Sequence, residues 1–279
     1  MSDRDCSTCV FCDCDRLEPQ FALPILGRSA QWMRCGRCRS IQVSRVDWLD
    51  EAYRDLGVNI DTGCAQRSIL CSLYVRAMRA AGLLGRRGKV IDFGAGNGLL
   101  VRLLRDQGFE ALGYDRYVRA IDCAGFTVET LDAGTHHEAE LVTAIDVLEH
   151  LPYPRRTLAD IAANLAPQGL VLLRTPLCQP KVHGVDWEHL GGEHGQHISF
   201  ATREGLQHLA ESAGLRANFL PMDFLLLTRP DQRAGALRRL RLTLRAGWYF
   251  FLARSMGLCR FENALRDIQL LMANREPKR

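Results

Sequence analysis

Short apolar runs alternate with stretches of helical periodicity through most of the chain, from residue 89 onward. The periodic stretches predict helices at 98–107, 154–166 and 202–213. Because strands that alternate with helices form a mostly parallel sheet covered on both faces, the pattern predicts an α/β fold. The apolar runs predict its strands at 89–93, 110–114, 126–130, 141–145, 169–174, 216–224 and 267–273.

The first 88 residues follow two other patterns. Residues 1–46 are rich in cysteine, whereas residues 47–88 carry apolar side chains at three- and four-residue spacing, which indicates helices. We therefore expect a cysteine-rich segment at 1–46, a helical linker or cap at 47–88, and an α/β domain at 89–279.

A basic amphipathic helix is predicted within the last part, at about 231–257, where leucines and aromatic residues recur beside arginines. Such a helix can pack on its own domain, receive a partner or dock on an anionic bilayer. Peripheral membrane contact through residues 236–256 is therefore one hypothesis for this segment.

Composition is that of an ordinary globular protein, with 47% hydrophobic and 24% charged residues among 279. The net charge of +4 is too small to indicate nucleic-acid binding. No secretory signal opens the sequence, and no apolar run approaches the roughly 20 residues of a membrane helix. We therefore expect a cytoplasmic protein with reduced thiols.

Two CxxC pairs stand out among the eleven cysteines. Cys9 and Cys12 form the first pair, and Cys35 and Cys38 form the second. Two such turns can bring four thiolates onto one tetrahedral zinc ion, so the spacing predicts a structural Zn²⁺ site in a small ribbon. Apolar residues between the pairs predict a hairpin over the metal. In the first pair, Cys6 or Cys14 is an alternative ligand to Cys9 or Cys12.

The strand at 89–93 runs into three glycines at alternate positions, Gly94, Gly96 and Gly98. Glycines at the carboxyl end of a parallel strand let a ligand approach the backbone closely. A dinucleotide fingerprint would need glycine at position 99, where Leu99 stands, and the Lys-Ser/Thr of a Walker loop is also missing. Instead, Asp115 ends the second strand, and an acidic pocket suits a cationic ligand that bears hydroxyl groups.

The glycine loop, Asp115 and the segment "DVLEHL" at 146–151 together resemble the class I S-adenosylmethionine-dependent methyltransferases, and especially the ubiquinone and sugar methyltransferases. The resemblance extends over about residues 67–275 and implies a Rossmann-like, seven-stranded sheet. It implies that Asp115 accepts hydrogen bonds from both ribose hydroxyls and that Asp132 contacts the adenine. The cofactor-binding residues that it implies are Asp92, Phe93, Gly94, Ala95, Gly96, Asn97, Gly98, Asp115, Arg116, Asp132, Asp146 and Val147.

Methyl transfer to an oxygen, nitrogen or carbon often needs a base near the acceptor, and histidine titrates in the useful range. Four histidines lie between positions 183 and 197, where the family places a substrate-covering loop. His194 and His197 are candidates for the base, oriented by Glu193 or Glu188, and His150 after the fourth strand is another. These histidines could also be structural, or could form a metal site from Glu188, His189, Glu193, His194 and His197, which lacks the HExxH register.

The sequence therefore predicts S-adenosylmethionine-dependent methylation, on oxygen or carbon, of a small-molecule acceptor such as a sugar, a glycolipid or a secondary metabolite. An RNA methyltransferase that uses its ribbon to grip RNA is the alternative, and a non-catalytic binding protein is a third reading. Acidic residues beside the ribbon would repel phosphate, and the Asn/Asp-Pro-Pro-aromatic motif of base methylation is absent after the fourth strand. We therefore expect no stable nucleic-acid partner.

Overall fold

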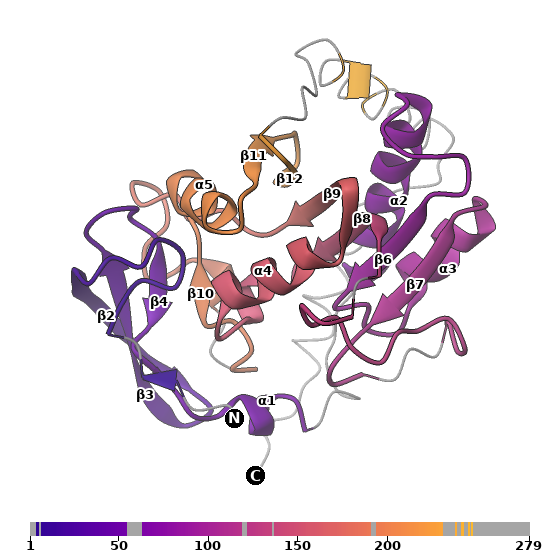
Figure 1. The fold of residues 1–279 in the computed structure, drawn as a ribbon. Coiled ribbons are helices and arrows are strands. Elements are labelled where there is room, and N and C mark those ends of the chain that lie inside the picture. Colours follow the sequence, from indigo (N-terminus) through magenta and orange to yellow (C-terminus); the bar gives the residue numbers. More distant parts are fainter. Residues whose placement is uncertain are drawn as a thin grey trace.

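The computed structural model describes residues 4–5, 7–54, 63–118, 122–135, 137–190 and 194–230, together with positions 238, 241, 242, 245 and 247. The expected strand at 267–273 and nearly all of the expected basic helix at 231–257 lie outside these residues. Cys6 and Glu193 also lie outside them. Within the described residues, two sheets stand side by side, as Figure 1 shows, and helices cover the larger one.

The larger sheet has six strands in the order β11-β12-β9-β8-β6-β7. Its centre is parallel, whereas β12 runs antiparallel to β9 and β11 runs antiparallel to β12. This arrangement confirms the predicted α/β class with a mostly parallel sheet. The strands are β6 (Lys89–Phe93), β7 (Glu110–Tyr114), β8 (Ala139–Ile145), β9 (Leu165–Arg174), β11 (Arg216–Phe219) and β12 (Phe224–Thr228).

Two of the predicted strands differ in the structure. The run at 126–130 forms only an isolated parallel bridge between Thr127 and Gly113. The prediction of one strand over 216–224 is wrong, because the chain reverses between β11 and β12, where Met222 and Asp223 have φ angles of 59° and 61°. Pro221 lacks the N–H that a continued strand would need, which favours a turn there. Among the described residues, β12 runs antiparallel to both of its neighbours in the larger sheet.

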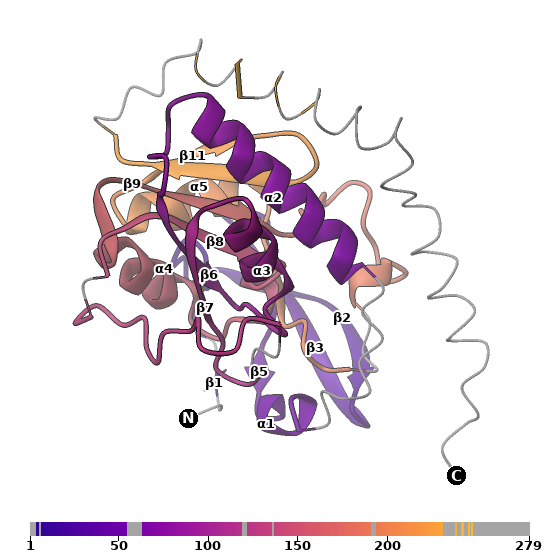
Figure 2. The same cartoon turned by 90° about the vertical axis from the view of Figure 1, so that its right-hand side faces the viewer.

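Helices cover both faces of this sheet, and alternate strand residues point to opposite sides. Val90 and Leu141 pack in one core with α2 (Cys64–Ala80) and α3 (Leu99–Asp106). Ile91 and Val142 pack in the other core with α4 (Pro154–Ala163) and α5 (Arg203–Ser212). Figure 2 shows α2 and α3 together on one side. No helix of the described residues is long and apolar enough to cross a membrane.

The cysteine-rich segment forms a second sheet, and one strand of this sheet comes from the α/β part of the chain. The expected hairpin is present as β2 (Leu17–Ile25) and β3 (Arg28–Cys35), followed by β4 (Ile41–Val43) and the short helix α1 (Leu49–Ala52). The strand β10 (Ser199–Phe200) pairs with β4 and completes the order β10-β4-β3-β2. The two parts thus share one sheet, and the boundaries 1–46, 47–88 and 89–279 stay a prediction. A separate two-stranded pair joins β1 (Arg4–Asp5) to β5 (Arg45–Val46).

Candidate functional site

The glycine loop connects β6 to α3, and its backbone conformation and close contacts exclude larger side chains at two positions. Gly94 has a φ of 76°, and a Cβ there would lie 2.4 Å from Val147 Cγ2. Gly98, with a φ of 90°, would bring a Cβ within 2.4 Å of Cys123 Sγ. The backbone is therefore pressed against its neighbours at both ends of the loop, which explains the need for glycine there.

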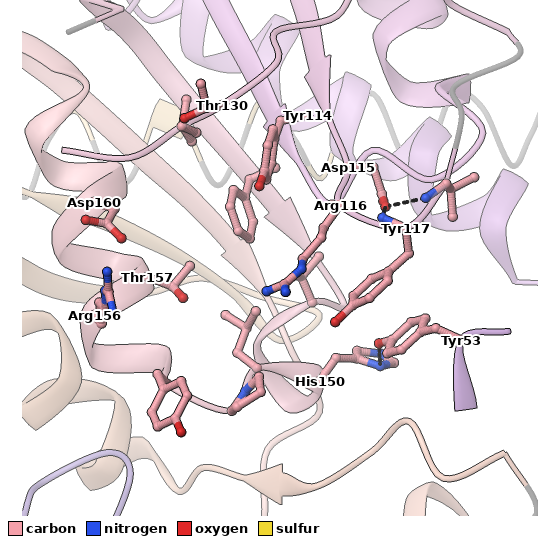
Figure 3. Close-up of a pocket in the computed structure, with 18 of the residues that line it drawn as sticks. Tyr53, Tyr114, Asp115, Arg116, Tyr117, Thr130, His150, Arg156, Thr157 and Asp160 are labelled. Atoms are coloured by element: carbon pink, nitrogen blue, oxygen red, sulfur yellow. Dashed lines mark hydrogen bonds between the residues drawn. The ribbon is translucent and has the colours of Figure 1, made fainter. Parts of the chain in front are cut away.

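Asp115 follows β7 directly and holds its carboxylate in a fixed position. Oδ2 accepts a hydrogen bond from the backbone N–H of Gly96 at 2.9 Å. Oδ1 accepts from the N–H groups of Tyr117 and Val118, at 2.8 and 2.9 Å. The carboxylate thus joins the glycine loop to the turn after β7, and its orientation is set before any ligand arrives (Figure 3).

A cavity of about 570 Å³ opens in front of Asp115 at the carboxyl ends of the parallel strands. Figure 3 shows Arg116 and Tyr117 near Asp115, with Arg156, Thr157 and Asp160 of α4 on the opposite side. The residues expected at the site that line the cavity are Phe93, Gly94, Asp115, Arg116, Asp132, Asp146, Val147 and His150. Those expected at the site and placed elsewhere among the described residues are Asp92, Ala95, Gly96, Asn97, Gly98, His194 and His197.

Asp92 is a residue of β6, and its side chain is buried. The hydroxyl of Thr143 donates a hydrogen bond to Asp92 Oδ1 at 2.7 Å. Burial raises the pKa of the Asp92 carboxyl to about 7, although the Thr143 hydrogen bond acts in the opposite direction. Asp92 is therefore joined to β8 through Thr143, and its charge is costly in the folded protein.

We expect Asp92→Asn to stabilise the fold at alkaline pH. The raised pKa means that the folded state keeps a proton that the unfolded state loses, so wild-type stability falls as pH rises from about 4 to about 7. The variant is neutral and keeps an acceptor for Thr143, so its gain should reach at most about 4 kcal/mol at pH 8 and vanish near pH 4. Urea unfolding at both pH values measures this difference. A gain independent of pH, or one matched by the exposed control Asp106→Asn, would contradict it.

Asp146 lies at the end of β8 in an uncommon backbone conformation, with a φ of 53°. Its carboxylate forms ion pairs with Arg67 Nε, at 2.6 Å, and with Arg174 Nη1. Arg67 comes from α2, and Arg174 ends the neighbouring strand β9. The sequence analysis missed both arginines. The pairing of Arg174 with Ile145 across the two strands would have placed Arg174 next to Asp146. Nothing in the sequence around Arg67 indicates that it contacts Asp146.

Among the histidines that the structure describes, His150 is the one that lines the cavity. It belongs to the 3₁₀ turn η2 (Leu148–His150), and its Nδ1 lies 3.0 Å from the hydroxyl of Tyr53. The ring of His197 meets it edge to face, with centroids 4.8 Å apart. Burial lowers the pKa of His150, and the neighbouring His197 lowers it further. A neutral imidazole that faces the cavity is able to accept a proton at neutral pH.

The other histidine candidates lie farther from the cavity. His197 donates from Nδ1 to the carbonyl of His189 at 2.7 Å, and burial lowers its pKa. His194 is exposed. Glu193, its expected partner, lies outside the described residues. The roles expected for His194 and Glu193 stay predictions.

Glu149 forms a second group with the two inner histidines, and the sequence analysis did not assign it a role. It is buried, and Thr175 donates a hydrogen bond to its Oε2 at 3.0 Å. Burial raises the pKa of Glu149 to about 8. Ligand atoms of Glu149, His150 and His197 lie within 4.8 Å of one another, so this group could hold a cation. It differs from the metal set considered in the sequence, which shares only His197 with it.

Four cysteines converge in the amino-terminal ribbon. The sulfurs of Cys9, Cys12, Cys35 and Cys38 lie within 4.8 Å of one another, and all four side chains are buried. Contacts cross between the two pairs, with Cys9 Sγ 3.6 Å from Cys38 Sγ and Cys12 Sγ 3.5 Å from Cys35 Sγ. Four buried thiols around one point fit the donor set of a structural zinc ion.

The two CxxC turns have the same backbone geometry. Asp13 N–H donates to the Cys9 carbonyl, and Arg39 N–H donates to the Cys35 carbonyl in the same way. Both Asp13 and Arg39 have positive φ angles, of 60° and 62°. This repetition supports Cys9 and Cys12 as the first pair, and Cys14 lies outside the cluster. The alternative with Cys6 stays a prediction, because Cys6 is outside the described residues.

Comparison with known protein families shows which family the chain belongs to. The family described as "Methyltransferase domain" matches residues 60–218, which is more than half of the chain. The chain belongs to this family.

Individual relatives are distant. A ubiquinone biosynthesis O-methyltransferase of Aeromonas salmonicida is 28% identical over 159 residues, which cover 49% of this chain and 66% of the relative. The Pectobacterium atrosepticum protein of the same name is 31% identical over 115 residues, which cover 36% of this chain and 46% of the relative. The chain thus spans between about half and just under two thirds of the length of these relatives.

Solved structures resemble the fold at low identity. The magnesium protoporphyrin IX methyltransferase of Synechocystis with bound SAH is 18% identical, with a TM-score of 0.46 over 65% of this chain and 92% of that one. A complex of the Haloferax volcanii Trm112 methyltransferase activator with a methyltransferase matches at 16% identity and a TM-score of 0.47, over 66% of this chain and 96% of that one. The functional conclusion therefore rests on the residues of the site.

Proposed function

We propose that this protein transfers a methyl group from S-adenosylmethionine to a small-molecule acceptor. The observation that carries the proposal is the Asp115 carboxylate, which faces the cavity and is held by three backbone N–H groups. A fixed carboxylate beside a glycine loop can accept hydrogen bonds from a ribose diol without reorganising. The cofactor carries no phosphate, which fits a loop that lacks both phosphate-binding motifs.

The remaining lining residues suit the other parts of this cofactor. Phe93 and Gly94 would contact its central portion, and Arg116 and Asp132 would contact the adenine. Asp146 and Val147 would lie toward the reacting end, beside His150. When bound, S-adenosylmethionine supplies an electrophilic methyl group on a sulfonium. The protein has to bind it, exclude water and align the acceptor.

His150 is the residue that we propose as the base. It lines the cavity and is neutral near pH 7, because burial and His197 lower its pKa. The Tyr53 hydroxyl, 3.0 Å from Nδ1, orients the ring. His150 would take the proton that an acceptor hydroxyl loses as the methyl group arrives. The buried carboxyl of Glu149 and the ring of His197 lie directly behind it.

The acceptor class that we propose is a hydroxyl-bearing small molecule, such as a sugar, a glycolipid or a secondary metabolite. The O-methyltransferases among the relatives support methylation of oxygen. Methylation of RNA is less favoured, because the ribbon carries acidic residues beside its cysteines and the net charge is only +4. Cytoplasmic location and membrane contact through 236–256 stay predictions, and that helix lies almost wholly outside the described residues.

We also propose that the four clustered cysteines bind a structural Zn²⁺. Replacing Cys35 by serine removes one thiolate from the cluster, so we expect the loss of about one zinc per chain, measured by elemental analysis of the purified protein. Cys64→Ser is the matched control, because Cys64 lies on α2 and outside the cluster. Equal zinc in the Cys35 variant and in wild type would contradict the assignment.

Calorimetric titration tests the proposed cofactor. S-adenosylmethionine and its demethylated product should both bind the purified protein, whereas NAD⁺ and ATP should give no heat. S-adenosylmethionine should bind without any acceptor in the solution, because the residues proposed to contact the cofactor do not depend on a bound acceptor. No heat with S-adenosylmethionine, or tighter binding of NAD⁺, would overturn the proposal.

A further inference from the structure

The segment 194–202 carries His197 and lies against the cysteine-rich part of the chain for most of its length. Gln196 lines the cavity, and its side-chain amide donates to the carbonyl of Ala52 at 3.2 Å. The indole of Trp48 donates to the carbonyl of Gly195 at 2.8 Å. A Cβ at Gly195 would lie 2.8 Å from Leu26 Cδ1. One end of the segment is therefore held by residues 26–52.

The middle of the segment is paired with the ribbon sheet. Gln42 of β4 pairs with Ser199 of β10, and Val43 N–H donates to the carbonyl of Ile198 at 2.9 Å. The buried side chain of Gln42 reaches the opposite way, to the first CxxC turn. It accepts from Val10 N–H at 2.9 Å and donates to the carbonyl of Thr8 at 3.1 Å, on either side of Cys9.

The far end of the segment contacts the second CxxC turn. Thr202 Oγ1 donates to the carbonyl of Cys38, and Thr202 N–H donates to Ser40 Oγ at 3.1 Å. Ser40 Oγ lies 3.2 Å from Cys38 Sγ. Thr202 also caps α5, and a Cβ at Gly205 would lie 2.2 Å from Ser40 Oγ. Thus both CxxC turns are joined to the segment, one at its middle and one at its end.

The same segment also touches the candidate base. Ile198 N–H donates to the carbonyl of Glu149 at 2.9 Å, and His197 packs against the ring of His150. Tyr53, just past α1, contacts His150 on another side. By contrast, the hydrogen bonds that fix Asp115 all come from residues 96–118 of the α/β part. The acceptor half of the site thus depends on the ribbon, whereas the cofactor half has its own supports.

We propose that the cysteine ribbon is a positioning element for the acceptor half of the site, with Gln42, Ser40 and Thr202 holding segment 194–202 against the clustered cysteines. This inference rests on the proposed function. It assigns the ribbon a role in acceptor chemistry, in place of nucleic-acid binding or independent stability. Disturbing these contacts should impair methyl transfer and leave cofactor affinity in place.

Thr202→Val tests the proposal, because valine keeps the shape and removes the hydroxyl contacts to Cys38 and Gly205. We expect unchanged zinc content, S-adenosylmethionine affinity within about twofold of wild type, and faster hydrogen exchange of the amides at 198–202. We expect kcat to fall about 10- to 100-fold, since small misplacements near the reacting atoms are costly. Thr202→Ser should restore both exchange and kcat. Thr228→Val is the matched control, a buried threonine on β12.

Unchanged exchange and kcat in the Thr202 variant, or a parallel loss of cofactor affinity, would overturn the proposal. If the valine variant loses zinc or fails to fold, the same measurements are made on Ser40→Ala, which removes the hydroxyl that accepts from Thr202 N–H. Ser212→Ala, at the other end of α5, is the control for this variant. Failure of the proposed function is distinguishable, because wild type would then bind no S-adenosylmethionine while the exchange difference remained.

Discussion

Asp115→Ala is expected to weaken the binding of S-adenosylmethionine about 100-fold or more. The variant loses a charged acceptor that serves two ribose hydroxyls, and each hydrogen bond to a charged group contributes about 1.5–3 kcal/mol. It also frees the N–H groups of Gly96, Tyr117 and Val118, which the carboxylate holds in wild type. The loop and the turn after β7 then lose their common partner, so the site is less well ordered before binding.

Isothermal calorimetry of S-adenosylmethionine with wild type and variant measures this effect. Asp106→Ala provides the control, because Asp106 is an exposed aspartate that pairs with Arg102 at the end of α3. Asp115→Asn separates the two contributions, since an amide keeps an acceptor oxygen and lacks the charge. Affinity of the alanine variant equal to wild type would remove the main support for the cofactor assignment.

The proximity of the glycine loop and Asp115 could be predicted because these residues follow neighbouring strands. Gly94 comes directly after β6 and Asp115 directly after β7, so parallel pairing alone brings them together. The cysteine cluster was predictable for a similar reason, since each CxxC turn is a local structure. What the sequence left open was the choice of the first pair, and the matching turns at Asp13 and Arg39 support Cys9 and Cys12.

The surroundings of His150 could not be predicted in the same way, because the contacts there join distant positions. His150 and His197 meet only when the loop after β9 folds back across η2, and Tyr53 arrives from a third region. Sequence spacing cannot say which of several clustered histidines turns inward. The strand β10 could not be predicted from the sequence either. Its two residues are too few to show a periodic pattern, and their pairing depends on β4 of the ribbon.

Burial also separates residues that look equivalent in the sequence. Asp92 and Asp115 both follow apolar residues, yet Asp92 is buried with a pKa raised to about 7, whereas Asp115 faces the cavity. The difference comes from the position of each within its strand, since Asp92 precedes the last residue of β6 and Asp115 follows β7. Asp115 lies two positions beyond Gly113, the residue that pairs with Asp92, so one carboxyl is buried within the sheet and the other lies past the end of its strand.

His150→Gln is expected to lower kcat by about 100- to 10,000-fold while the affinity for S-adenosylmethionine stays near that of wild type. Glutamine fills similar space and can still hydrogen-bond to Tyr53, but it cannot accept the acceptor's proton. Single-turnover assays with an acceptor identified from small polar or lipid fractions would measure the rate, and calorimetry would measure the affinity. His208→Gln is the control, because His208 lies on α5 beside Glu204 and Glu211.

The pH profile gives an independent test of the same assignment. Burial and His197 lower the pKa of His150 below the ordinary value of 6.5, so the base stays neutral into mildly acidic solution. The acidic limb of kcat/KM should therefore lie below pH 6.5, since activity falls as pH drops through the lowered pKa. Replacing His197 by glutamine removes one cause of the lowering and should move the limb upward. A limb above pH 6.5 in wild type would exclude His150 as the base and would point to Glu149, because burial raises the pKa of its carboxyl to about 8. A His150→Gln enzyme with full kcat would also exclude His150 and direct attention to His197, whose pKa is lowered as well.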